Sequence, residues 1–409
     1  MTIIVGAGLS GLCCARTLHD AGASFLLLDA ADAVGGRVRT DVVDGFRLDR
    51  GFQVLLTSYP EARRVLDYKA LRLKPFTSGA KVWMGDAFAT VSDPFREGLA
   101  GLATVVSPVG TLADKLRVLA LRQSVRAGRV DDLWQRPETS TMDALASRYG
   151  FSREMIGTFF RPFLGGVLLD PELGASSRSF EFYFRMFSEG DAALPAEGME
   201  AIPRQLAAPL PPAQIRLNTR VERVEPGRVV LAGGETLDAS AVVVATEGPE
   251  AHRLVGEGVR EEKSTVALYW AADSPPVPDA TLLLDGTGQG PVNNAQVMSN
   301  VAPSYAPEGQ ALMSASVLGN PSGSDEDLER AARQQLAGWF GKSVQGWRFL
   351  SASRVRHALP DLPSVEPPER PLALGEGLFL TGDHRRNASI NGAMVAGRHA
   401  AEAVLHASA

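Results

Sequence analysis

A glycine turn close to the N-terminus constrains the fold more than any other feature of the sequence. Residues 3–5, IIV, form a short apolar run typical of a strand buried on both faces, and Gly6, Gly8 and Gly11 follow as G-x-G-x-x-G. In such a unit the first glycine allows a tight turn, the second lets a pyrophosphate approach the backbone, and the third lets the helix pack close to the strand. The pattern predicts a helix whose first amides face the phosphates of a dinucleotide.

The residues after the turn supply the rest of this nucleotide-binding unit. A second apolar run covers residues 25–28 and ends in Asp29, about 20 residues after the turn, where a carboxylate can accept hydrogen bonds from a ribose diol. Another glycine-rich segment, GTGQG at residues 286–290, is followed by no helical pattern, so we interpret it as a loop. The sequence therefore predicts one bound dinucleotide, held at the N-terminal turn.

Length and composition indicate a globular protein of two domains. The chain has 409 residues, 45% apolar and 22% charged, and exceeds the size at which one hydrophobic core keeps growing. The net charge of -6 argues against nucleic acid as a partner, because phosphate binding needs clustered Lys and Arg. Cys13 and Cys14 are adjacent in a predicted helix, so we expect apolar packing, without a disulfide or a metal site.

Two segments bear on where the protein resides. The first residues lead directly into the predicted strand and leave no room for a secretory leader, so we expect a cytoplasmic protein. Residues 98–113 form an uncharged stretch that contains Pro108 and is too short to span a bilayer. This stretch could be a buried core segment, line an apolar tunnel or contact a membrane surface, so peripheral membrane contact is a further expectation.

Motifs at both ends of the chain resemble those of one flavoprotein superfamily. GGRVRT at residues 35–40, together with the GAGLSG turn, looks like the extended signature of the flavin amine oxidases, protoporphyrinogen oxidases and phytoene desaturases. Near the C-terminus, GLFLTGD (residues 377–383) resembles the strand that returns to the cofactor, and ASINGAMVAGRHAAEAV (residues 388–404) resembles the helix after it. The resemblance implies an α/β fold with a Rossmann-like, GR2-type domain that binds FAD non-covalently.

The resemblance also implies roles for individual residues. Arg37 and the Ser10 hydroxyl would lie near the pyrophosphate, and Asp383 would contact the ribityl chain or the pyrophosphate. The helix start at residues 390–393 would face the pyrimidine edge of the flavin, where its partial positive charge stabilises the reduced ring. The expected cofactor residues are Gly6, Ala7, Gly8, Leu9, Ser10, Gly11, Asp29, Ala30, Gly35, Gly36, Arg37, Val38, Gly51, Phe52, Gln53, Val221, Ala245, Thr246, Gly382, Asp383, Ser389, Ile390 and Ala393.

The rest of the chain is expected to form a substrate domain of mixed helices and strands. The predicted bounds are residues 1–56, 195–262 and 366–409 for the FAD-binding domain, and residues 57–194 and 263–365 for the substrate domain. Apolar residues three and four apart predict helices at residues 59–71, 110–128 and 141–150; in the second they include Leu112, Leu116, Leu119 and Val125. Residues 264–356 combine strand patterns with one helix at residues 325–340.

The resemblance leaves several reactions open. In amine oxidases of this superfamily an aromatic residue precedes the final helix and a lysine stands on a substrate-domain strand, whereas this chain has Ser389 and Thr265 there, with Lys263 two residues away. GDHRRNASINGA (residues 382–393) and DRGFQVLLTSYPEA (residues 49–62) look more like phytoene desaturases. They favour an FAD-dependent oxidoreductase that transfers a hydride from an apolar, isoprenoid-type substrate to flavin N5. A flavin amine oxidase and a non-oxidative flavin-dependent isomerase stay open.

Several polar side chains are candidates for the catalytic site. Gln53, Arg161 and Arg354 could face the flavin, although structural hydrogen bonds or ion pairs would explain them equally well. We expect His357 and His384 to be packed or surface side chains.

Two aromatic segments bear on the substrate. Residues 159–170 and 179–203 could line a slot for a long hydrophobic substrate, a small molecule, or form the core between the domains. The sequence does not choose between oxygen and a quinone as the electron acceptor.

Overall fold

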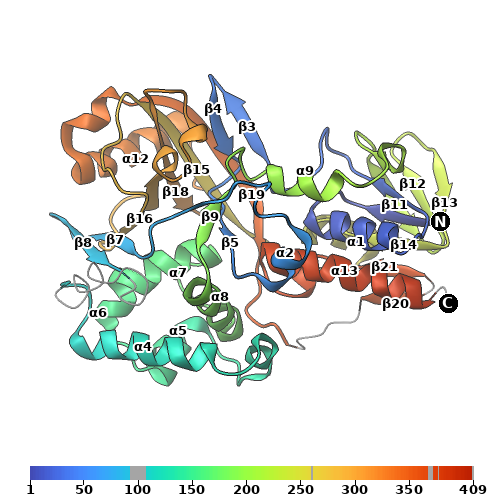
Figure 1. The fold of residues 1–409 in the computed structure, drawn as a ribbon, viewed down its shortest axis with the longest axis horizontal. Helices are drawn as coiled ribbons and strands as arrows, with labels where there is room; N and C mark the ends of the chain where they lie inside the picture. The colour runs from blue at the N-terminus through green and yellow to red at the C-terminus, as the bar shows by residue number, and fades with distance from the viewer. Residues whose placement is uncertain (93–106, 259–260, 367–371, 376, 408–409) are drawn as a thin grey trace.

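The computed structural model describes residues 1–92, 107–258, 261–366, 372–375 and 377–407. Figure 1 shows α1 (Leu9–Asp20) and α13 (Ile390–Ala407) side by side at one end of the molecule, close to both termini. At the other end a layer of helices lies beneath a second sheet. The expected fold class, a Rossmann-like α/β unit beside a mixed helical and β-sheet part, is confirmed.

The sheet near the termini is built from segments far apart in the sequence. In spatial order its strands are β10 (Ile215–Arg216), β2 (Phe25–Leu28), β1 (Thr2–Val5), β14 (Ala241–Val244), β21 (Leu378–Leu380) and β20 (Ala373–Gly375). All neighbouring pairs are parallel except β20 with β21. Because β21 pairs with β14 and β14 pairs with β1, the end of the chain returns to its beginning. We call this unit the six-stranded part.

Successive residues of its central strands point into two separate hydrophobic cores. Ile4 and Val243 pack in the core that contains α1 and α13, whereas Ile3 and Val242 pack on the opposite face. That face is covered by the antiparallel strands β11 (Val221–Glu225), β12 (Arg228–Leu231) and β13 (Thr236–Asp238) and by α10 (Gly248–Val255). A strand buried on both faces has to be apolar throughout, which explains the runs IIV and AVVV.

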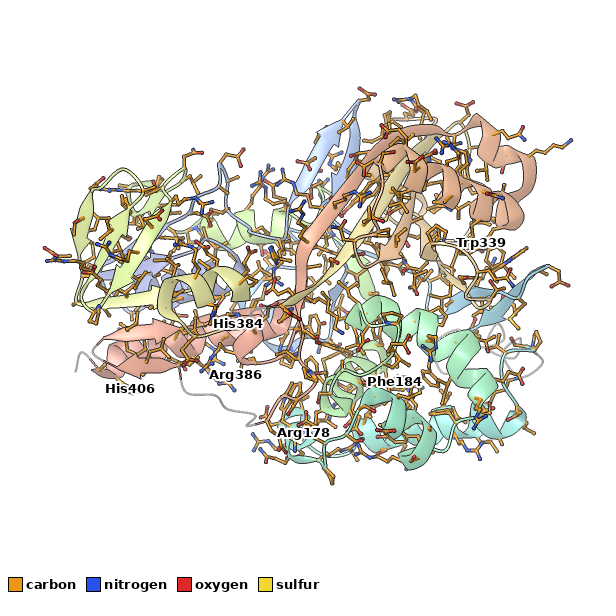
Figure 2. The ribbon with its side chains drawn as sticks, turned by 180° about the vertical axis from the view of Figure 1, so that it is seen from behind. Arg178, Phe184, Trp339, His384, Arg386 and His406 are labelled. Carbon is orange, nitrogen blue, oxygen red and sulfur yellow. The ribbon has the colours of Figure 1, made fainter. Side chains whose placement is uncertain are left out.

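The other half of the molecule, which we call the seven-stranded part, contains a mainly antiparallel sheet. In spatial order its strands are β19 (Arg348–Pro360), β15 (Glu262–Ala272), β18 (Ala311–Leu318), β17 (Val292–Val297), β16 (Leu282–Asp285), β7 (Ala80–Trp83) and β8 (Phe88–Val91). One face packs on α12 (Asp325–Phe340), where Leu336 and Trp339 meet Val266 and Trp270. Trp339 is labelled in Figure 2. The Ser324 side chain caps this helix by accepting a hydrogen bond from the Asp327 amide.

Short elements connect the two parts. They are the hairpin β3 (Thr40–Val43) and β4 (Phe46–Asp49), the small sheet β5 (Leu55–Leu56), β9 (Ala192–Leu194) and β6 (Lys74–Pro75), and the helices α2 (Pro60–Val65), α9 (Ala201–Ala207) and α11 (Met298–Val301). The buried Asp49 carboxylate accepts hydrogen bonds from the Tyr305 hydroxyl at 2.8 Å and from the Met199 amide at 3.0 Å. The hairpin is thereby tied to the seven-stranded part.

The helical layer differs from the sequence prediction in detail. Its helices are α4 (Leu112–Arg126), α5 (Thr141–Asp143), α6 (Arg153–Met155), α7 (Arg161–Leu168) and α8 (Ser177–Glu189), and π-helical turns extend α5 and α6. The predicted helix at residues 59–71 is wrong beyond Val65, where Leu66 becomes extended. Leu66 and Leu71 are buried in the core, so tertiary packing overrides the local helical pattern.

The apolar stripe on α4 is only partly buried. Val125 is fully buried, but Leu112, Leu116 and Leu119 are 65%, 59% and 37% exposed. Residues 98–106 of the uncharged stretch before this helix lie outside the described residues. Among the described helices, none combines the length and the apolar character that crossing a membrane requires.

Candidate cofactor and substrate site

A cavity of about 830 Å³ extends from the carboxyl edge of the six-stranded sheet to the helical layer and the seven-stranded sheet. The carboxyl edge of such a sheet is where nucleotide ligands bind in related α/β architectures. Of the expected cofactor residues, those that line the cavity are Gly6, Gly8, Leu9, Ser10, Asp29, Ala30, Gly35, Gly36, Arg37, Val38, Gly51, Phe52, Gln53, Val221, Ala245, Thr246, Gly382, Asp383, Ser389, Ile390 and Ala393. Ala7 and Gly11 are buried behind the turn and do not line it.

The three glycines of the turn face different surroundings. Gly6 has φ +106°, and a Cβ there would lie 2.8 Å from the Ala245 carbonyl oxygen. A Cβ on Gly11 would overlap the Gly6 carbonyl oxygen, so only glycine lets α1 lie this close to β1. A Cβ on Gly8, by contrast, would meet no protein atom within 4 Å. The backbone at Gly8 therefore borders open space at the start of α1, where helix amides lack intrahelical partners.

Asp29 is held firmly at the end of β2. Its two carboxylate oxygens accept hydrogen bonds from the Ala7 amide at 2.6 Å and from the Ala31 amide at 2.7 Å. Each carboxylate oxygen can accept more than one hydrogen bond, so the group can bind a ligand hydroxyl as well. The same residue thus orients the glycine turn and presents an acceptor to the cavity.

The two ends of the chain meet at the cavity. The Arg37 guanidinium donates to the Asp383 carboxylate at 2.8 Å, and the Ser10 and Thr381 hydroxyls lie 3.1 Å apart. Burial lowers the pKa of Arg37, but the Asp383 carboxylate outweighs this and leaves the pKa above its ordinary value. Gly397 of α13 packs against the Ser10 backbone with no space for a side chain. These contacts place the start of α13 beside the start of α1.

The N-terminus of α13 opens onto the cavity. The Ser389 hydroxyl accepts a hydrogen bond from the Gly392 amide at 2.8 Å, and Ile390 and Ala393 line the wall. The Tyr183 hydroxyl donates to the Ala388 carbonyl at 2.9 Å and ties this turn to α8. The partial positive charge of the helix start therefore faces the cavity.

Glu262 is a buried carboxyl where β15 leaves the six-stranded part. Its Oε1 accepts from the Gly248 amide at 3.1 Å, and its Oε2 lies 3.7 Å from Nδ1 of the half-exposed His357. Burial raises the pKa of Glu262 to about 7, which Arg37 opposes and Asp383 reinforces. This carboxyl is therefore one whose charge changes near neutral pH.

The far end of the cavity is apolar and aromatic. Phe159, Phe163, Phe184 and Phe187 line it from the helical layer, and Phe184 is labelled on α8 in Figure 2. Their neighbour Phe160 is fully buried in the core. Some residues of the two aromatic segments therefore form the hydrophobic core, and others line the cavity.

Comparisons with known proteins place this architecture in a family. The sequence profile described as flavin containing amine oxidoreductase matches residues 9–405. The chain belongs to this family. Protoporphyrinogen oxidase 2 of Arabidopsis thaliana is 26% identical over 190 residues, covering 43% of this chain and 34% of that protein. Polyamine oxidase 2 of Arabidopsis thaliana is 45% identical over 49 residues, covering 12% of this chain and 10% of that protein. The matches thus span about a third or less of these two relatives.

A solved structure shares the fold over almost its whole length. The crystal structure of a putative protoporphyrinogen oxidase from Exiguobacterium sp. 255-15 superimposes with a TM-score of 0.75, covering 99% of this chain and 98% of that one. Sequence identity is 19%, so this likeness concerns the fold. The expected superfamily is confirmed, and with it the flavoprotein character of the family.

The geometry of the cavity fits FAD. The space beside Gly8 that any Cβ would fill, the acceptor on Asp29 and the positive end of α13 lie along one cavity. These are the features that a pyrophosphate, a ribose and a flavin ring require. The described residues contain no cluster of three or more His, Cys, Asp or Glu side chains that could hold a metal ion.

Two of the three catalytic candidates lie away from the cavity. Arg161 is partly exposed and bonds to the Pro171 carbonyl, and Arg354 pairs with Asp325 at the start of α12. Neither lines the cavity, and of the two alternatives that the sequence left open the structural one, a hydrogen bond or ion pair with a nearby partner, accounts for both. Gln53 does line it, but its side-chain amide donates to the Arg37 carbonyl at 2.9 Å and to a second backbone carbonyl.

The remaining polar candidates behave as the sequence suggested. His357 is exposed at the surface and His384 is fully buried, so the prediction of surface or packed histidines is confirmed. Thr265 lines the cavity, whereas Lys263 pairs with Asp170 at 3.4 Å and with Asp361 at 3.3 Å. The cavity wall at this strand therefore contains a threonine, whose hydroxyl donates to the Val317 carbonyl at 3.0 Å, and not a lysine.

Several polar residues of the cavity wall were not predicted from the sequence, among them two on the seven-stranded sheet. Asn294 and Ser316 line the cavity from β17 and β18. The available signal was the alternation in NNAQV and MSASV, which is equally typical of a strand with one face in water. Nor was it predicted that Leu112, Leu116 and Leu119 line the cavity from α4.

Proposed function

We propose that this protein binds one FAD molecule non-covalently along the cavity. The amides of the glycine turn and α1 would hold the pyrophosphate, Asp29 a ribose diol, and the start of α13 the pyrimidine edge of the flavin. Non-covalent binding is proposed because no cysteine or histidine belongs to the described cavity wall. Cys13 and Cys14 are buried in α1, away from it.

We propose further that the protein is an oxidoreductase acting on an apolar, isoprenoid-type substrate, in the manner of the phytoene desaturase-like enzymes. When bound, FAD supplies the hydride acceptor at N5. The phenylalanines of α7 and α8 would orient the substrate and exclude water, and the α13 dipole would stabilise negative charge on the reduced ring. The single observation that carries this proposal is the continuity of one cavity from the glycine turn to the aromatic wall.

The proposal is tested with purified protein. We expect a yellow protein whose flavin is released by heat or acid, and whose absorbance bleaches under anaerobic conditions with a carotenoid or another apolar substrate. Colourless protein that does not bind added FAD would refute the proposed cofactor. Reoxidation of the bleached protein by oxygen or by a quinone identifies the electron acceptor, which we propose to be one of these two.

Amine oxidation is the second candidate. It is supported by the local match to polyamine oxidase 2. It is opposed by Thr265 and by the lack of any carboxylate, among described residues, on the cavity wall of the seven-stranded part. A cationic amine would lose its hydration there without a counter-charge. Peroxide formation with a panel of mono- and polyamines would favour this candidate. A third candidate is a flavin-dependent isomerase, and turnover that requires dithionite-reduced flavin would indicate it.

We also propose a cytoplasmic protein that touches a membrane surface through α4. The support is that Leu112, Leu116 and Leu119 are exposed and border the cavity, which suits an apolar substrate that enters from lipid. Co-sedimentation with phospholipid vesicles should decline in Leu116→Ser. Equal sedimentation of the variant and the wild type would refute this contact.

A further inference from the structure

Part of the sheet face that looks onto the cavity is polar, although it is buried. Asn294 and Gln296 on β17, and Ser314 and Ser316 on β18, alternate with apolar residues that pack in the α12 core. These four side chains are 3%, 0%, 0% and 5% exposed, respectively. Polar groups removed from water destabilise a fold unless they are hydrogen-bonded, so apolar side chains at these positions would carry a smaller free-energy cost of burial.

The hydrogen bonds of this face leave two atoms available at the cavity. The side-chain amide nitrogen of Asn294 donates to Gln296 Oε1 and to Ser316 Oγ, both at 3.2 Å, and Asn294 Oδ1 accepts from the side-chain amide of Asn293 at 3.0 Å. The Ser316 hydroxyl oxygen thus accepts one hydrogen bond. No described residue accepts a hydrogen bond from its proton. Asn294 Oδ1 retains a second lone pair. Only Asn294 and Ser316 of the four line the cavity.

This polar pair lines the same cavity as the expected cofactor residues. Ser316 pairs with Ala267 in the β15–β18 register, two residues from Thr265, which is a separation of ~7 Å along a strand. A Cβ on Gly51 would lie 3.8 Å from the Thr265 side chain, so Thr265 links the pair to Gly51, one of the expected cofactor residues. Gly166 of α7 lets the helix rest on Asn294, because a Cβ there would come 3.2 Å from Asn294 Oδ1.

The charges around the pair decide what it can bind. The described cavity wall of the seven-stranded part contains no carboxylate, and its charged side chains, Lys115 and Arg122, lie on α4. A hydroxyl donor beside an amide acceptor suits a neutral group that both accepts and donates. We propose, on the basis of the proposed function, that Asn294 and Ser316 bind a neutral hydroxyl, carbonyl or amide on an otherwise apolar substrate, close to its reacting carbon.

The test compares volatile probes that differ only in their polar end. Holoprotein is equilibrated with octane, 1-octanol or octylamine, and headspace gas chromatography gives the free concentration of each, hence Kd. Ser316→Ala removes the hydroxyl, Ser316→Thr restores one, and Leu284→Ala enlarges the apolar wall as a control. We expect Ser316→Ala to weaken 1-octanol binding about fivefold, as for one hydrogen bond, with octane unchanged. Ser316→Thr should retain tight 1-octanol binding, and Leu284→Ala should weaken octane and 1-octanol by the same factor.

The outcomes separate this inference from the proposed function. Holoprotein that binds octylamine more tightly than 1-octanol, or that binds none of the probes, overturns the inference and leaves the flavin site standing. Equal weakening of octane and 1-octanol in Ser316→Ala also overturns it, because the residue would then act through packing alone. Purified protein that cannot be loaded with FAD overturns the proposed function, and this inference falls with it.

Discussion

Gly8→Val should separate cofactor binding from folding. A Cβ on Gly8 would meet no protein atom within 4 Å, and the backbone there has φ −71° and ψ −177°, which any residue can adopt. Loss of glycine flexibility in the unfolded chain stabilises the fold by about 0.4–1 kcal/mol, and a valine N-cap is less favourable by a similar amount. The free energy of unfolding of the apoprotein should therefore change by less than about 1 kcal/mol.

The same valine should greatly weaken the binding of FAD. Its side chain fills the space in which a pyrophosphate would approach the first amides of α1, before the first intrahelical bond from the Leu12 amide to the Gly8 carbonyl. Loss of two phosphate hydrogen bonds, at about 1.5 kcal/mol or more each, corresponds to at least ~100-fold in Kd. Quenching of flavin fluorescence during titration of apoprotein measures this affinity.

Gly11→Ala is the matched control for Gly8→Val. Its Cβ would overlap the Gly6 carbonyl oxygen, so α1 has to move away from β1. We expect the free energy of unfolding of the apoprotein, measured in urea, to fall by about 1–3 kcal/mol, as for an overpacked core. The reasoning is refuted if Gly8→Val binds FAD as the wild type does, or if its apoprotein is destabilised as strongly as Gly11→Ala.

Three further predictions follow from contacts around the cavity. Asp383→Ala should destabilise the apoprotein by about 3 kcal/mol in urea unfolding, because it leaves Arg37 without its buried partner; an unchanged midpoint would contradict the ion pair. Since burial raises the pKa of Glu262 to about 7, the folded state holds a proton that the unfolded chain releases near pH 4.5, and stability should fall as pH rises between these values. Glu262→Gln should remove on the order of 2 kcal/mol of this fall, and parallel pH profiles of variant and wild type would argue against the assignment. Burial raises the pKa of Cys13 to about 12 and that of Cys14 further, so Ellman's reagent at pH 8 should label both only after denaturation; rapid labelling of the native protein would disprove their burial.

The cofactor half of the site was largely predictable because its signals are local. Gly6 and Gly11 occupy positions where the backbone or the close packing excludes a Cβ, Gly8 leaves the space of a Cβ open, and Asp29 ends the next strand. The Gly-Asp pair at residues 382–383 was interpretable only through its resemblance to a family motif. No periodicity in the sequence indicates that Asp383 lies 2.8 Å from Arg37.

The substrate half was less predictable because its residues are defined by what they face. Arg161 and Arg354 looked available in the sequence, but each has a nearer partner in the fold. Asn294 and Ser316 follow the alternation of a strand with a solvent face, and only the helical layer over β17 and β18 turns that face into a cavity floor.

The sequence by itself determined the glycine turn, the doubly buried strands, the helix α12 and the membership of a flavoprotein superfamily. Each of these depends on backbone dihedral angles and on burial patterns that repeat within a few residues. Only the tertiary structure decided which faces meet: α13 on α1, α7 on the polar strands, and the leucines of α4 at the cavity edge. The physical reason is that burial and hydrogen bonding between distant segments depend on long-range packing, which no local pattern encodes.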